Sequence, residues 1–67
     1  MFQRNLFEAA LKTRSKTLSD IAEHLKINRG TLYKKVSQVT DFTRAEVQEI
    51  KEFLNLSTQE TMSIFYG

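Results

Sequence analysis

The fold is decided by residues 17–36, which read TLSDIAEHLKINRGTLYKKV. This stretch predicts two short helices joined by a tight turn, because apolar residues recur at helical spacing on both sides of Lys26. Thr17 and Asp20 form a capping pair for the first of these helices, and Asn28 caps the second. The apolar positions are expected to face one interior: Ile21, Ala22, Leu25, Ile27, Leu32 and Val36.

The outer face of the second of these helices is expected to remain exposed, and it holds Arg29, Gly30, Tyr33 and Lys34. A short helix with a cationic and aromatic outer edge fits the major groove of DNA, where arginine pairs with guanine O6 and N7. Glycine would let the backbone come close to the bases. The candidate phosphate contacts, some through backbone N–H groups at helix starts, are Thr17, Ser19, Asn28 and Lys35.

The stretch resembles the helix-turn-helix of the bacteriophage Cro and cI repressors (XRE-like regulators), in which a small alanine, a turn and two later aliphatic residues recur at this spacing. The segment INRGTLYKKV is also similar to the reading helix of Fis-type domains. The string FTRAEVQEIKEFLNLSTQETMSIFY is similar to the C-terminal half of short regulators from phages of Gram-positive bacteria, which favours the Cro/cI family. The resemblance covers about residues 3–65 and implies an all-α fold: a compact five-helix bundle like the DNA-binding domain of lambda repressor.

Two residues depart from the pattern of that family. Lys26 occupies the turn position usually given to glycine, which would cost about 1 kcal/mol if its backbone is left-handed. Leu18 stands where many relatives carry a polar residue that contacts phosphate.

Three further helices are predicted outside residues 17–36. Asn5 and Glu8 are a capping pair for a first helix ending near residues 12–15, with Leu6, Phe7, Ala10 and Leu11 on its inner face. Thr43 and Glu46 form a capping box for a helix that Asn55 ends, with Val47, Ile50, Phe53 and Leu54 facing inward. Ser57, followed by Glu60, opens the last helix.

The C-terminal residues are unusually apolar, and two interpretations stay open. Met62 and Phe65 either pack back onto the first and fourth helices, because so small a core needs every large side chain, or Ile64, Phe65 or Tyr66 stays exposed and joins two subunits.

Length and composition narrow the classes of function. Sixty-seven residues make a single domain, and the absence of cysteine excludes a disulfide or a thiolate metal site. No apolar run approaches the ~20 residues that span a bilayer, and no signal peptide is expected. His24 is the only histidine and is expected to be a solvated surface residue, so neither a metal site nor a catalytic pair is predicted.

Charge is distributed unevenly along the chain. Residues 1–40 hold eight cationic and three anionic side chains, a net +5, whereas residues 41–67 hold two and five, a net −3. A basic half would bind a polyanion and an acidic half would avoid it. The cations of the first connection, Lys12, Arg14 and Lys16, are expected either to touch phosphates or simply to favour the end of a helix.

These features predict a non-enzymatic, cofactor-free regulator that binds double-stranded operator DNA in the host cytoplasm. The resemblance implies a place in a phage lysis–lysogeny switch, as a Cro-type protein, with homodimerisation an open question. The alternative is a small antirepressor that grips a partner phage repressor through Arg29, Tyr33 and Lys34. Neither the operator nor the direction of regulation follows from the sequence.

Overall fold

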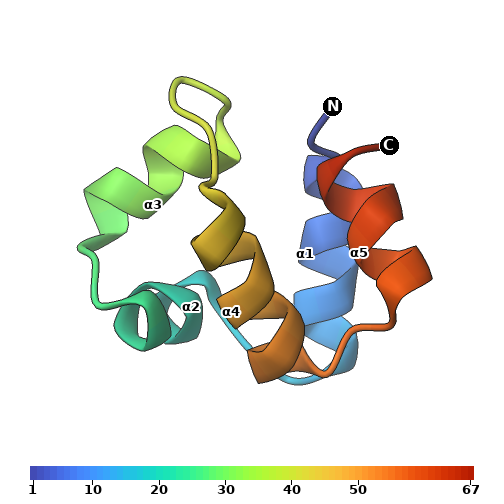
Figure 1. The fold of residues 1–67 in the computed structure, drawn as a ribbon. Coiled ribbons are helices and arrows are strands. Elements are labelled where there is room, and N and C mark those ends of the chain that lie inside the picture. Colours follow the sequence, from blue (N-terminus) through green and yellow to red (C-terminus); the bar gives the residue numbers. More distant parts are fainter.

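The computed structural model describes all 67 residues and contains five α-helices and no strand, which confirms the predicted all-α bundle (Figure 1). The α2–α3 pair lies on one side of the molecule, α1 and α5 lie side by side on the other, and α4 stands between them. The two termini meet, since the N-terminal ammonium lies 3.3 Å from the carbonyl oxygen of Gly67. The helices are α1 (Arg4–Thr13), α2 (Leu18–Leu25), α3 (Arg29–Val36), α4 (Arg44–Leu54) and α5 (Thr58–Phe65).

Local capping chemistry starts four of the five helices where the sequence predicts. The side chains of Thr17, Thr43 and Ser57 each accept a hydrogen bond from the backbone N–H three residues on. The acidic side chain of that later residue in turn accepts a hydrogen bond from the backbone N–H of the capping residue. Asn28 caps α3 through Oδ1, which accepts from the N–H of Thr31 at 2.7 Å. Each such cap satisfies an N–H group that the helix itself leaves free.

The predicted cap of α1 is wrong. Asn5 lies inside the helix and Glu8 pairs with Arg4 at 2.9 Å instead. The residue before α1 is Gln3, which makes no side-chain cap, but its backbone N–H donates to the carbonyl of Ile64 on α5. A tertiary contact therefore fixes the start of α1, and local sequence carries no signal of it.

The first four helices end in the same way. Each is followed by a residue with a left-handed backbone, and none of the four is glycine: Ser15, Lys26, Gln38 and Asn55. The next N–H in each case reaches back five residues to a helix carbonyl, at 2.8–3.0 Å. This arrangement satisfies carbonyls that would otherwise lack a donor and ends each helix. Lys26, with φ 59° and ψ 41°, confirms that the turn between α2 and α3 is left-handed without glycine.

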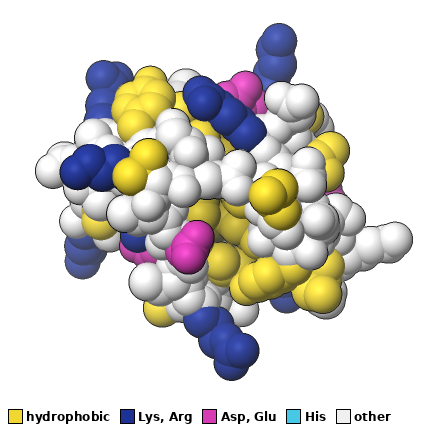
Figure 2. All heavy atoms as spheres, turned by 90° about the horizontal axis from the view of Figure 1, so that it is seen from above, with side chains coloured by type: hydrophobic (Ala, Val, Ile, Leu, Met, Phe, Trp, Pro, Cys, Tyr) yellow, Lys and Arg dark blue, Asp and Glu magenta, His cyan; other side chains and the backbone are white.

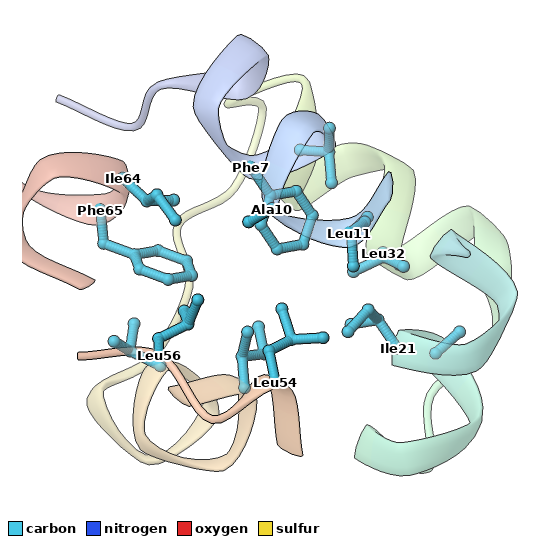
Figure 3. Close-up of a cluster of buried hydrophobic side chains, with 13 residues drawn as sticks. Phe7, Ala10, Leu11, Ile21, Leu32, Leu54, Leu56, Ile64 and Phe65 are labelled. Carbon is cyan, nitrogen blue, oxygen red and sulfur yellow. The ribbon is translucent and has the colours of Figure 1, made fainter. Parts of the chain in front are cut away.

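The core joins all five helices through thirteen buried apolar side chains (Figure 3). The predicted inner residues of the α2–α3 pair are either buried, as Ala22 is, or packed against this core. At the other end of the core, four phenylalanine rings lie with centroids 5.2–6.2 Å apart, an arrangement favourable for tilted and edge-on aromatic pairs. These rings belong to Phe2, Phe7, Phe42 and Phe65.

Three expectations for apolar residues are wrong: an inward Leu6, a packed Met62, and an exposed Ile64 or Phe65. Leu6 points outward from α1, because Phe7, Ala10 and Leu11 already fill the face that α1 turns to the core. In the tail, Ile64 and Phe65 are only 3% and 7% exposed and point from α5 into the core, so neither can form a subunit interface (Figure 3). Phe65 packs back as expected, but Met62 is exposed, as is Tyr66.

Arg14 links three helices rather than pointing to solvent. Its Nε donates to the carbonyl of Leu54 at 2.6 Å, and Nη1 donates to that of Ala10 at 3.2 Å. Nη2 lies 3.1 Å from Glu60. The N–H of Ser57 and this guanidinium together hold the pKa of Glu60 below its usual value. Arg14 thus ties the end of α4 to α1 and α5, which removes it from the candidate phosphate contacts.

Candidate nucleic-acid interface

The outward face of α3 carries the four side chains predicted to read bases. Arg29, Gly30, Tyr33 and Lys34 are all exposed, and Leu32 and Val36 on the opposite face are about 1% exposed. The Tyr33 ring is half exposed, which leaves a large flat group available to a partner. The predicted separation of buried and outward faces on α3 is confirmed, and contact of the outer face with DNA stays a prediction.

Arg29 is held by a residue of the neighbouring helix. Its Nε donates to Oγ of Ser19, in the first turn of α2, at 2.9 Å. The bond joins the two helices of the motif and occupies Nε, so that Nη1 and Nη2 remain to donate outward. Ser19, predicted to bind phosphate, therefore has a second role that the sequence analysis missed. Its hydroxyl accepts from Arg29 and still has its own proton to donate.

The first turn of α3 also presents backbone donors. The N–H groups of Arg29 and Gly30 have no acceptor within the protein, whereas that of Thr31 is satisfied by the Asn28 cap. Free N–H groups at a helix start attract anions, and the helix dipole adds to this attraction. This end of α3 can therefore accept a phosphate or a base acceptor directly on its backbone.

Gly30 is not required by the fold. Its φ is not positive, and a methyl group added there would meet only Oδ1 of Asn28, at an ordinary contact distance of 3.4 Å. Glycine weakens a helix by about 0.5–1 kcal/mol relative to alanine. The missing side chain leaves the α3 backbone open to an external surface.

Two of the predicted phosphate contacts are already engaged inside the protein. The hydroxyl and the N–H of Thr17 belong to the capping box with Asp20, at 2.8–3.2 Å. Lys35 is only 11% exposed; its Nζ lies 3.0 Å from Glu46 and donates to the carbonyl of Asp41. Lys35 is therefore a structural link between α3 and α4, which its position beside Lys34 did not reveal.

The contact with Lys35 also helps to lower the pKa of Glu46. Burial acts to raise the pKa of Glu46, but the N–H of Thr43 and the ammonium of Lys35 outweigh burial and hold that pKa below 4.5.

The segment that contains α3 carries only positively charged side chains. Residues 24–40 contain Lys26, Arg29, Lys34 and Lys35 and no carboxylate. Of these cations only Lys35 forms an ion pair. Elsewhere, Arg4 and Arg14 are also neutralised by acidic neighbours. The three cations of residues 24–40 that form no ion pair are therefore on or beside α3: Lys26, Arg29 and Lys34.

His24 is exposed, as expected, but it also contacts a neighbouring helix. Its ring stacks on that of Phe53 with centroids 4.3 Å apart, and its Nε2 lies 3.1 Å from Glu49. Lys16 lies over the other ring of the pair, 5.2 Å from the Phe53 centroid. The cluster fastens α2 to α4 and has no group of three metal-binding side chains around it.

Comparison with known proteins adds no relative: no family model, curated protein or solved structure matches the chain. None of the five helices is long and apolar enough to cross a bilayer.

Proposed function

We propose that the protein is a sequence-specific, DNA-binding transcriptional regulator that inserts α3 into the major groove. The observation that carries the proposal is the outer face of α3, which is cationic, free of carboxylates and held in place by the Ser19–Arg29 hydrogen bond. A side chain that is already oriented loses less entropy on binding. The family resemblance adds the proposed setting, a phage lysis–lysogeny switch.

Each residue of this face has a distinct role in the proposed complex. Arg29 donates from Nη1 and Nη2 to O6 and N7 of one guanine, since Ser19 holds its Nε. Gly30 and the free N–H groups of the first turn bring the α3 backbone close to the DNA. Tyr33 and Lys34 reach a neighbouring base or a flanking phosphate. The side-chain amide nitrogen of Asn28 and the hydroxyl proton of Ser19 remain for phosphate oxygens.

Selection of bound duplexes from a randomised pool tests the proposal, because the operator sequence is not needed in advance. The wild-type protein should enrich one short motif containing guanine, and its affinity should fall as salt rises, as expected for a protein that neutralises phosphates. Weak binding to all duplexes without enrichment would argue against sequence-specific regulation.

In a second candidate function, the outer face of α3 binds a partner repressor instead of DNA. The half-exposed ring of Tyr33 beside Arg29 favours it, because tyrosine and arginine are the residue types that most often anchor protein interfaces. The antirepressor would bind the DNA-binding domain of a phage repressor and show no affinity for duplex DNA at low salt. Titration of both ligands distinguishes the two functions.

A further inference from the structure

We infer that a small hollow between α4 and α5 binds an acidic, partly apolar segment of another protein. The hollow has a volume of about 200 Å³. Sites for small-molecule ligands are usually larger, about 300–1,000 Å³, so a hollow of this size suits the side chains of a protein segment. Its lining combines cationic and apolar side chains, among them Arg44, Val47, Lys51, Met62 and Tyr66.

The charge of this α4–α5 hollow is of one sign. Its two charged side chains are Arg44 and Lys51, and neither takes part in an ion pair within the protein. The carboxylate of Glu52 does not line the hollow and accepts a hydrogen bond from Gln48 at 2.8 Å. The larger hollow that adjoins it is lined by a lysine and an aspartate, so it favours neither sign. The α4–α5 hollow therefore specifies an anionic group on its ligand.

The positions of the lining residues also specify a spacing. Arg44 and Lys51 are seven residues apart on α4, which separates them by ~10 Å along the helix axis. Val47, between them in the sequence, lines the same hollow. Across it, Met62 and Tyr66 are both more than half exposed. A segment with an apolar side chain between two acidic ones therefore matches the hollow.

The residue types of the lining are those of a protein interface. Arginine, tyrosine and methionine are enriched where proteins bind one another, and arginine clusters recognise acidic motifs. A similar mixture of exposed hydrophobic and cationic side chains is visible on the end of the molecule shown in Figure 2.

Two other occupants fit the hollow less well. Residues 41–67 carry a net charge of −3, so the surroundings of the hollow repel an extended polyanion such as DNA. A second copy that docked through the same face across a two-fold axis would bring the arginine and lysine of each hollow towards those of the other. A different protein with a few well-placed carboxylates avoids both repulsions.

Selection from a random peptide library displayed on phage tests the inference without DNA, so its outcome is independent of the proposed function. The wild-type protein should enrich peptides with an apolar residue between two acidic ones, and salt should weaken their binding. Arg44→Glu should bind an enriched peptide at least about tenfold more weakly, because like charges then meet. A peptide with lysines in place of its acidic residues should bind the double variant Arg44→Glu, Lys51→Glu more tightly than the wild type.

The loss of binding in Arg44→Glu cannot come from unfolding. Arg44 is the first residue of α4, where the helix dipole favours a carboxylate, so the melting temperature should not fall. Lys34→Glu is the matched control for peptide binding. It makes the same change of charge at an exposed cation without an ion pair, on α3, and should bind the peptide as tightly as the wild type.

Four results would overturn the inference. The first is a selection that enriches no acidic motif. The second is a peptide that loses affinity for Lys34→Glu and keeps it for Arg44→Glu, which would place the contact on α3. The third is displacement of the peptide from the wild type by duplex DNA of random sequence, and the fourth is a wild-type dimer that Arg44→Glu abolishes. These last two would assign the hollow to DNA or to a second copy.

Discussion

Replacing Gly30 by alanine should change the stability of the protein and its affinity for DNA in opposite directions. Gly30 lies in the first turn of α3 with a negative φ, and the added methyl group meets only Oδ1 of Asn28 at 3.4 Å. Nothing in the protein therefore opposes the substitution. Alanine removes the entropic cost of glycine in a helix, so the free energy of unfolding should rise by about 0.5–1 kcal/mol. For a domain of this size that corresponds to a melting temperature about 2–8 °C higher.

DNA binding by Gly30→Ala should change in the opposite direction. If the α3 backbone approaches the bases at this point, the methyl group meets DNA instead of open solvent. Overpacking of this kind costs about 1–3 kcal/mol, which corresponds to a dissociation constant raised about 5- to 150-fold. Thermal melts and fluorescence anisotropy with the selected duplex measure the two effects on the same preparation.

Asn5→Ala is the matched control for Gly30→Ala. Asn5 is exposed within α1, forms no side-chain hydrogen bond and lies on another helix, so alanine should stabilise α1 by some tenths of a kcal/mol. Its DNA affinity should equal that of the wild type. If Gly30→Ala is more stable and binds DNA as tightly as the wild type, the backbone of α3 does not approach DNA at this residue.

Three predictions concern the fold itself. Lys26→Gly should raise the free energy of unfolding by some tenths to about 1 kcal/mol in urea titrations, because glycine adopts the left-handed backbone without cost; a loss of stability would contradict this. Ala22→Leu should lower it by about 1–3 kcal/mol by overpacking the crossing of α2 and α3, and an unchanged melting midpoint would refute that crossing. Because Thr43 and Lys35 hold the pKa of Glu46 below 4.5, the stabilisation from its carboxylate is present above that pH and is lost as pH falls through the lowered value. Glu46→Gln should therefore show a smaller loss of stability in acid than the wild type, and an identical acid transition would contradict the assignment.

Features set by neighbouring residues could be predicted from the sequence. The capping boxes at Thr17, Thr43 and Ser57 and the left-handed end of α4 at Asn55 depend on side chains within three or four residues. The left-handed residues at Ser15 and Gln38 gave no such signal, because neither residue type is typical of that backbone.

Features set by contacts between helices could not be predicted. Lys35 and Lys34 are adjacent cations, and only the position of Glu46 on α4 makes one structural and leaves the other free. His24 gave no sign of its stacking on Phe53, which lies 29 residues further along the chain. The outer face of α3 followed directly from helical periodicity, whereas the bond between Ser19 and Arg29 requires the crossing geometry of α2 and α3.

Arg29 on α3 is proposed to read a base, and binding by Arg29→Ala is the measurement that bears on this role first. Binding of Arg29→Ala to the selected duplex and to duplexes altered at each guanine should be compared with that of Lys34→Ala at several salt concentrations. Arg29→Ala should lose about 1–3 kcal/mol of binding free energy on the selected duplex and should no longer discriminate at one base pair. Lys34→Ala, if it contacts phosphate, should weaken all duplexes alike and reduce the salt dependence. If Arg29→Ala keeps wild-type affinity and discrimination, α3 does not read a base through Arg29.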